Sequence, residues 1–289
     1  MSIRLSNRTF AFMEKLVYTA QIFTFFMRSL RSGEATLAIP TGLNENSLLE
    51  YQECISSKYE AKYLCHRSYY HNRTTDFAPC LSKYTTEKGS TIHFLGDSVT
   101  AEIYSSLRCS FPMLNLRYYS IKRKSNRLSP AKTYATTVKA NLQDGDVVVL
   151  NFGLWYNLYE HDLKQYKKDL SELASYLKYP TRPDIRHIWM HSSAQHFCTT
   201  DGTYHRMKSR RAAKKCCKPK IVSRLRQDLA ENILLKNTGL EIFDLHGKTS
   251  ERWSDHLGSG DCTHFCIDYG GLIHEVGNKL LSETCKSDN

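Results

Sequence analysis

The sequence predicts an α/β protein with a central parallel sheet covered by helices on both faces. Two observations lead to this fold class. Short apolar runs such as 146–152 are continuous rather than alternating, as expected for strands buried on both faces. Between these runs lie longer segments with helical periodicity, and regular alternation of strands and helices is typical of a parallel sheet.

The predicted elements follow one another from residue 91 to the end of the chain. Strands are expected at 91–95, 146–152, 185–192 and 240–245, and helices at 99–108, 162–179, 221–237 and 269–283. The helix at 162–179 is the clearest, because its apolar residues recur every three or four positions, at Leu163, Tyr166, Leu170, Leu173 and Leu177.

Active sites of parallel sheets lie at the carboxyl ends of the strands. Four segments follow predicted strands and are expected to gather at one sheet edge: Ser98, 151–153, 192–193 and the residues after Leu245.

The length of 289 residues is enough for one large domain with a small appendage. We divide the chain into a leader (1–45), a cysteine-bearing N-terminal segment (46–90) and a main domain (91–289). The leader contains the apolar stretch 16–27, flanked by basic residues. This stretch is short for a membrane span and closer to a signal-peptide core, although an N-terminal anchor and an amphipathic buried helix are alternatives.

Ten cysteines are spread along the chain, and none forms a CxxC pair. An even number with scattered spacing favours disulfide bonds in an oxidising compartment over zinc binding. Adjacent cysteines at 216 and 217 also suit no common zinc geometry. Glycosylation sequons at Asn7 and Asn72 agree with that compartment.

A candidate nucleophile lies in the segment "TIHFLGDSVT", where a predicted strand ends in Gly96-Asp97-Ser98 and a helix follows. A serine at such a strand-to-helix turn can project its hydroxyl from the sheet edge. The alternative is that Asp97 or Ser98 only caps the helix, since both residue types are favoured N-caps.

A candidate base and its orienting carboxylate lie in "GDCTHFC" near the C-terminus, as His264 and Asp261. A turn there could bring the carboxylate to one imidazole nitrogen and leave the other facing Ser98. A zinc site using Cys262, His264 and Cys266 is the competing interpretation, although no further ligands can be located.

Four segments in order resemble the SGNH/GDSL hydrolase superfamily, and more closely its PC-esterase branch, which includes the trichome birefringence-like polysaccharide O-acetyltransferases. They are "FLGDSVTAEIYSSLRC", "VVVLNFGLWYN", "SSAQHF" and "IFDLHGKTSERWSDHLGSGDCTHFC". The resemblance covers about 91–285 and implies a three-layer α/β/α domain. It implies that Ser98 is the nucleophile, His264 the general base and acid, and Asp261 the residue that orients it, with Asp97 structural.

The resemblance also implies which residues form the oxyanion hole and contact the substrate. The Ser98 N–H is expected to be one donor, and the second is the Gly153 N–H or the Asn151 side chain, with Trp155 nearby. The chain departs from the family after the serine, where Ala101-Glu102 replaces the Arg-Asn usual in the transferases. It also contains no glycine between Gly96 and Gly145, where the superfamily usually has an oxyanion glycine.

The function implied is O-acyl transfer, in particular O-acetyl transfer, to polysaccharide hydroxyls through an acyl-serine intermediate. A carbohydrate O-acetylesterase and a non-catalytic carbohydrate-binding protein are the alternatives. No metal or cofactor and no nucleic-acid partner is expected, and the acyl donor is not specified. Work on glycans would place the chain in the Golgi lumen or membrane, with secretion as the alternative.

Two further features bear on the glycan partner. The stretch 205–224 is rich in lysine and arginine and contains no acid, in a chain of net charge +11. It is either a solvated loop tied down by Cys216 or Cys217 or a patch for an anionic polysaccharide. Four aromatic residues could line a sugar cleft or belong to the core: Trp155, Tyr156, Tyr159 and Trp253.

Overall fold

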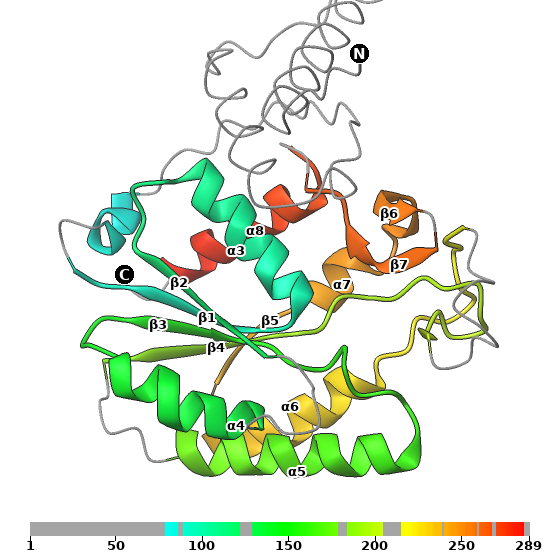
Figure 1. The fold of residues 1–289 in the computed structure, drawn as a ribbon, viewed down its shortest axis with the longest axis horizontal. Helices are drawn as coiled ribbons and strands as arrows, with labels where there is room; N and C mark the ends of the chain where they lie inside the picture. The colour runs from blue at the N-terminus through cyan, green and yellow to red at the C-terminus, as the bar shows by residue number, and fades with distance from the viewer. Residues whose placement is uncertain are drawn as a thin grey trace, which may run out of the picture. The chain divides into compact units, whose positions relative to one another are not determined.

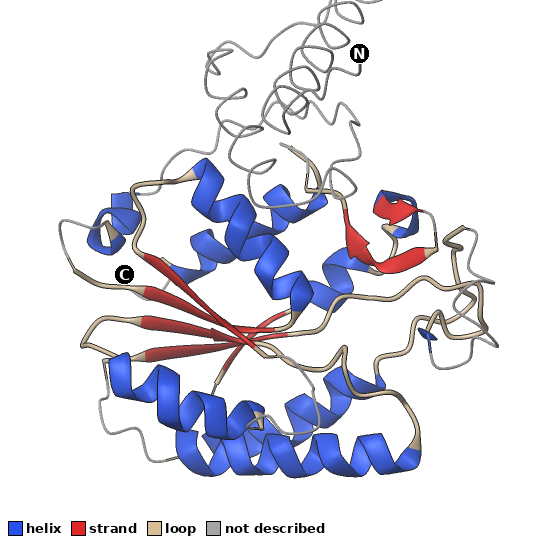
Figure 2. Ribbon diagram, viewed as in Figure 1, coloured by secondary structure: helices blue, strands red, loops and turns tan. Residues whose placement is uncertain are grey.

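The computed structural model describes residues 79–85, 89–121, 129–178, 184–204, 215–238, 240–258, 260–267 and 270–285. These residues form a three-layer α/β/α domain around a parallel sheet of five strands in the order β2-β1-β3-β4-β5, which confirms the predicted fold class (Figures 1 and 2). The strands are β1 (Ile92–Gly96), β2 (Leu116–Ser120), β3 (Val147–Leu150), β4 (Arg186–Met190) and β5 (Glu241–Phe243).

The helices form the two outer layers. The helices are α3 (Ser98–Ser110), α4 (Pro130–Thr133), α5 (Glu160–Leu177), α6 (Leu225–Thr238), α7 (Leu245–Thr249) and α8 (Leu272–Thr284). Figure 1 shows α3, α7 and α8 on one face of the sheet and α4, α5 and α6 on the other. Short segments of 3-10 or π helix are found at Pro79–Tyr84, Tyr134–Val138, Lys139–Asn141 and Trp253–Asp255.

Two hydrophobic cores lie on opposite faces of the sheet because neighbouring side chains of a strand point to opposite sides. In β1, Phe94 packs into the core under α3 and α8, whereas Leu95 packs into the core over α5 and α6. All residues of β1 and β3 are buried, as their continuous apolar runs predict. The central strands are therefore fixed in position from both sides, and so are the residues that follow them.

The strand order places a topological switch point beside β1. This strand pairs with β2 on one side and with β3 on the other, because the chain runs from β1 through α3 to β2 and then returns to β3. Ligand sites of such doubly wound sheets lie at the carboxyl ends of the two strands where the order reverses. In this chain the segments at that point are the Gly96–Asp97–Ser98 turn and residues 151–153.

The structure differs from the sequence prediction at several elements: the short elements α4, α7 and β6 (His256–Gly258) were not predicted, and two further differences are larger. Strand β2 was not predicted, because it lies at the sheet edge and is only half buried, so its sequence "LRYYS" has no continuous apolar run. The "GDCTHFC" segment was expected to be a loop, but most of it forms strand β7 (Asp261–Phe265), which pairs antiparallel with β6 (His256–Gly258).

The leader 1–45, both sequons and most of the segment 46–90 lie outside the described residues, so the predictions for them stay predictions. Within the described ranges, no helix combines the length and apolar character needed to cross a bilayer.

Candidate active site

The turn between β1 and α3 presents Ser98 as the first residue of the helix. Glycine is needed at position 96, since a Cβ there would lie 2.2 Å from the Thr100 Oγ1 atom. Asp97 is the N-cap: its Oδ1 accepts hydrogen bonds from the N–H groups of Val99 (3.1 Å) and Thr100 (3.4 Å). Asp97, and not Ser98, therefore caps helix α3. This agrees with the structural role that we expected for Asp97.

Ser98, His264 and Asp261 form a continuous chain of hydrogen bonds. The Oγ of Ser98 lies 2.7 Å from Nε2 of His264, and Nδ1 of the same ring lies 2.9 Å from Oδ2 of Asp261. The second carboxylate oxygen, Oδ1, accepts the backbone N–H groups of Thr263 (3.2 Å) and His264 (3.1 Å). With its proton on Nδ1, the imidazole donates to Asp261 and can accept the Ser98 proton at Nε2, which is the arrangement of an activated serine.

The surroundings of the ring favour its protonated form. Burial would raise the pKa of Asp261, but the hydrogen bond and charge of His264 and two backbone N–H groups lower it to about 2. Burial would lower the pKa of His264, but the hydrogen bond to Asp261 and the charges of Glu102, Asp261 and Asp97 raise it to about 9. A base that must hold the serine proton in a transition state gains from such stabilisation of its imidazolium.

The predicted oxyanion donors lie at the switch point. The Ser98 N–H is at the first position of α3, where no intrahelical acceptor exists. The Asn151 side chain is 1% exposed; its Nδ2 donates to the Met190 carbonyl (2.7 Å), and its Oδ1 accepts the Thr100 hydroxyl (3.3 Å). Asn151 is thus engaged with β4 and α3, and the Gly153 N–H stays the other predicted donor.

The loops after β3 and β4 are in close contact at this edge. A Cβ at Gly153 would lie 2.3 Å from the Ser192 Oγ, so the Ser192 side chain occupies the space that an alanine side chain would need. The Ser192 carbonyl in turn accepts a hydrogen bond from the Gln227 side chain of α6 (2.9 Å). The predicted gathering of 151–153 and 192–193 at one edge is confirmed.

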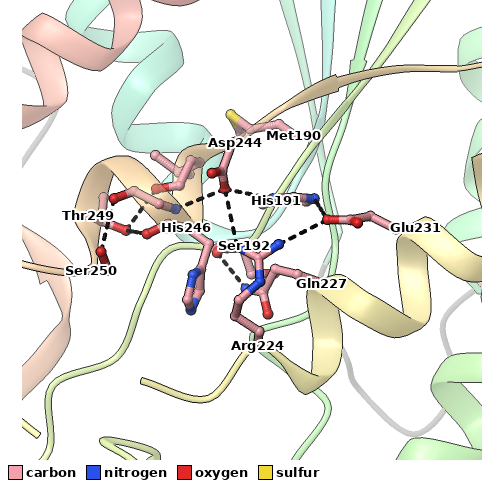
Figure 3. A network of polar contacts seen from close by, with 12 residues as sticks. Met190, His191, Ser192, Arg224, Gln227, Glu231, Asp244, His246, Thr249 and Ser250 are labelled. Carbon is pink, nitrogen blue, oxygen red and sulfur yellow. Dashed lines mark hydrogen bonds and ion pairs between the residues drawn. The ribbon is translucent and has the colours of Figure 1, made fainter. Parts of the chain in front are cut away.

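A charged network fixes the same edge next to β5 (Figure 3). His191, directly after β4, has Nδ1 2.9 Å from Asp244 Oδ1 and Nε2 3.0 Å from Glu231 Oε1. Arg224 approaches both carboxylates, Glu231 at 3.1 Å and Asp244 at 3.9 Å. These contacts join the ends of β4 and β5 to α6 and thereby fix the position of the segment that follows β4.

Strand β7, which bears Asp261 and His264, is fixed by disulfides. Cys262 is bonded to Cys216, and Cys266 is also disulfide-bonded. A second bond joins Cys198 to Cys217, and no described cysteine is free. The disulfide prediction is confirmed, and the zinc interpretation of this loop is wrong because its sulfurs are already bonded. Nor does the described part of the chain contain another cluster of His, Cys, Asp or Glu suited to a metal ion.

Two buried histidines, His196 and His256, contact each other, and His256 also contacts the backbone of β7. No sequence signal predicted this pair. Nδ1 of His256 lies 2.8 Å from the carbonyl oxygen of His264, and its Nε2 lies 2.7 Å from Nδ1 of His196. Nε2 of His196 lies 2.8 Å from the Ser250 carbonyl oxygen. The "SSAQHF" segment is thus joined to the strand of the proposed base.

The aromatic residues considered for a sugar cleft divide into two groups. Trp155, Tyr159 and Trp253 are 44%, 50% and 39% exposed, and the Tyr159 ring stacks on His161 with ring centroids 6.3 Å apart. Tyr156 is 5% exposed and packs against Tyr166 with ring centroids 4.8 Å apart. Tyr156 is therefore a core residue and does not line a cleft.

Glu102 is a site residue that the sequence prediction noted only as a departure from a family motif. It is 1% exposed and lies four residues after Ser98, on the same face of α3. That spacing from the candidate nucleophile is the signal that could have identified it.

The basic stretch is only partly described, since 205–214 lie outside the described residues. Its cysteines, Cys216 and Cys217, are both in disulfides, as the tied-loop interpretation predicts. Binding of an anionic partner stays a prediction.

Comparisons with known proteins leave the activity open. No protein-family model matches the chain, and no curated protein matches it. Among solved structures, an acetyl xylan esterase variant from Geobacillus stearothermophilus is 14% identical, with a TM-score of 0.43 over 68% of this chain and 95% of that one. The acetyl xylan esterase AlAXEase is 15% identical, with a TM-score of 0.41 over 67% of this chain and 98% of that one. Similarity at this level assigns no activity to this chain.

Proposed function

We propose that this protein is a serine-dependent enzyme of the SGNH type that transfers an acyl group, specifically an acetyl group, to a polysaccharide hydroxyl. The observation that carries the proposal is the hydrogen-bonded series Ser98–His264–Asp261 at the switch point of a parallel sheet. The order of its motifs along the chain resembles the PC-esterase branch, and this resemblance supports the acetyl group and the glycan.

In the first half-reaction Ser98 is acylated. Its Oγ attacks the carbonyl carbon of the acyl donor while Nε2 of His264 accepts the hydroxyl proton. The oxyanion that forms is stabilised by the N–H groups of Ser98 and Gly153. Collapse of this intermediate breaks the bond between the acyl carbon and the leaving group of the donor, which takes the proton from His264. Asp261 keeps the imidazole oriented and stabilises its cation.

In the second half-reaction the acyl group leaves Ser98. An acceptor hydroxyl gives its proton to His264 and attacks the acyl carbon, and the Ser98 oxygen then recovers the proton. A sugar acceptor makes the enzyme a transferase, whereas water makes it an esterase. The exposed rings of Trp155 and Trp253 support a sugar acceptor, because aromatic faces pack well on pyranose rings.

We place the protein in the secretory pathway, in the Golgi or as a secreted protein. Disulfides persist in oxidising compartments, and the described cysteines are all bonded. The acceptor that fits a chain of net charge +11 is an anionic polysaccharide.

The deciding experiment separates enzyme from binder first. Wild-type protein and the Ser98→Ala variant are incubated with p-nitrophenyl acetate, and intact-mass spectrometry follows acetylation. We expect one acetyl group on Ser98 of the wild type and none in the variant. Absence of both acetylation and p-nitrophenol release with the wild type would instead support the alternative, a non-catalytic carbohydrate-binding protein.

A second assay separates transferase from esterase. Acyl-enzyme is mixed with a deacetylated polysaccharide, and NMR spectroscopy follows whether acetylated polysaccharide or free acetate forms. Acetylated polysaccharide is the result expected from our proposal. Release of acetate alone, at a rate unaffected by the polysaccharide, would identify an esterase.

A further inference from the structure

Glu102 is a buried carboxyl whose side chain lacks normal hydrogen-bond partners. It is 1% exposed, and neither Oε1 nor Oε2 has a partner at hydrogen-bond geometry. A carboxylate in such a place is costly unless it is paired or protonated. An apolar residue would fill the same space on α3 without that cost, so the carboxyl calls for a physical explanation.

The groups around Glu102 belong to the serine site. On its own helix it faces Asp97, the N-cap residue next to Ser98. Glu102 lies one helical turn after Ser98, whose Oγ is 2.7 Å from Nε2 of His264, and α3 packs on β7. His264 and Asp261 therefore act on Glu102 from β7, and the backbone N–H of Phe265 also lowers its pKa. His264 is the cationic group among these neighbours, and both other side chains are acids.

Glu102 and His264 influence each other's protonation. Burial raises the pKa of Glu102 to about 8, although the charge of His264 opposes that shift. In the other direction, the charge of Glu102 is one of the causes that raise the pKa of His264 to about 9, together with Asp261 and Asp97. On its other side His264 is near His256, whose own pKa burial lowers to about 3, so that ring is neutral.

The coupling matters because only neutral His264 can take the Ser98 proton. While the Glu102 carboxyl is ionised, the imidazole retains its proton more tightly. While the carboxyl holds a proton, the imidazole is more easily neutral. The pair therefore determines how far the pH must rise before the serine can be activated.

We propose that Glu102 is a positioning residue that acts through His264, stabilising its imidazolium form and thereby setting the pH at which Ser98 becomes reactive. This inference rests on the proposed function of Ser98, His264 and Asp261. A carboxyl that served packing alone would leave the pH dependence of the site unchanged.

The test uses Glu102→Gln, which keeps the shape and removes the charge. The rate of Ser98 acetylation by p-nitrophenyl acetate is measured against pH in the full-length protein. We expect the acidic limb to move to lower pH by about one unit or more, as removal of a nearby opposite charge does. Glu102→Asp keeps a carboxyl and should retain the wild-type limb. The exposed Glu275→Gln on α8 is the matched control and should change nothing.

A second readout does not depend on activity. Imidazole NMR titration of His264 should show a lower pKa in Glu102→Gln than in the wild type. An unchanged His264 titration together with an unchanged acidic limb overturns the inference. If wild-type Ser98 is not acetylated at any pH, the proposed function fails, and the His264 titration alone decides whether Glu102 acts on that ring.

The remaining case is a Glu102→Gln chain that does not fold. The wild-type protein, labelled with carbon-13 at its glutamate carboxyls, then provides the measurement. We expect the Glu102 carboxyl to titrate in the same pH range as His264, well above an ordinary glutamate. A Glu102 titration curve with no inflection in the pH range where His264 titrates would contradict the inference.

Discussion

The hydroxyl oxygen of Ser98 lies 2.7 Å from Nε2 of His264, although 166 positions separate the two residues. Ser98 follows β1 of the five-stranded sheet, and His264 belongs to β7 of the separate two-stranded sheet. The packing of these two sheets within the fold brings the two side chains to hydrogen-bond distance. The contact between these two residues is therefore made by the tertiary fold and not by the local sequence.

Replacement of Ser98 by alanine should abolish acyl-enzyme formation and lower turnover by about 10⁴–10⁶-fold, as loss of a nucleophile does. Folding should be unaffected, because Asp97 caps the helix. Ser110→Ala at the other end of α3 is the control, since its hydroxyl only bonds the Ser106 carbonyl. Equal turnover in both variants, measured with an activated ester, would exclude Ser98 as the nucleophile.

Replacement of Asp261 by asparagine should lower turnover by about 10⁴-fold without moving the backbone, because an amide favours the wrong imidazole tautomer. Asparagine retains an acceptor for the N–H groups of Thr263 and His264. Steady-state kinetics and imidazole NMR together provide the measurement. A variant with normal turnover and the proton still on Nδ1 would show that the carboxylate is not needed.

The stability of the protein should depend on pH on both sides of neutrality. The folded pKa of Asp261, about 2, lies below its ordinary value of 3.8, so its contribution is present above 3.8 and is lost as the pH falls toward 2. The folded pKa of His264, about 9, lies above 6.5, so its contribution is present below 6.5 and is lost as the pH rises to 9. Urea unfolding at a series of pH values should show both declines, and a flat profile from pH 6.5 to 9 would contradict the second.

An alanine at position 153 should destabilise the protein by about 1–3 kcal/mol, the usual cost of overpacking. Its Cβ would lie 2.3 Å from the Ser192 Oγ but 3.4 Å from the Ser192 Cβ. Removing that hydroxyl in the double variant Gly153→Ala/Ser192→Ala should therefore restore most of the stability, as a double-mutant cycle in thermal unfolding would measure. Additive losses would mean that another contact limits this position.

Peptide mapping of the non-reduced protein should recover one cross-linked peptide set that joins Cys198, 216–217 and Cys262. Replacing Cys216 by alanine should cost about 2–4 kcal/mol of stability. It should also reduce Ser98 acetylation, because β7 would be less firmly fixed. Extensive alkylation of the native protein without reductant would contradict both the bonds and the secretory placement.

The central part of the fold could be predicted because its physical signals are local. Continuous apolar runs identify β1 and β3, and apolar periodicity identifies α5. Strand β2 could not be identified in this way, because an edge strand is partly solvated and pairs on one side only. Strand β7 is short and carries polar site residues, so its sequence resembles a turn.

Only the site residues that belong to recognisable sequence motifs could be predicted. Ser98, Asp261 and His264 were chosen from two short segments and are brought together by the fold. The burial of Glu102 could not be predicted, because it depends on β7 packing over α3. The His196–His256 contact likewise joins two loops that only the tertiary structure brings together.

The adjacent cysteines Cys216 and Cys217 have a consequence for biosynthesis. Cys217 is bonded to Cys198, 19 residues earlier, and Cys216 to Cys262, 46 residues later. While the nascent chain is being translated, both adjacent thiols are exposed to Cys198 before Cys262 is made. Cys198, Cys216, Cys217 and Cys262 can form two disulfides in three ways, and only one of these joins Cys216 to Cys262 of β7. We therefore expect maturation to depend on thiol–disulfide exchange, and expression in a reducing host to yield chains in which the strand of His264 is not cross-linked.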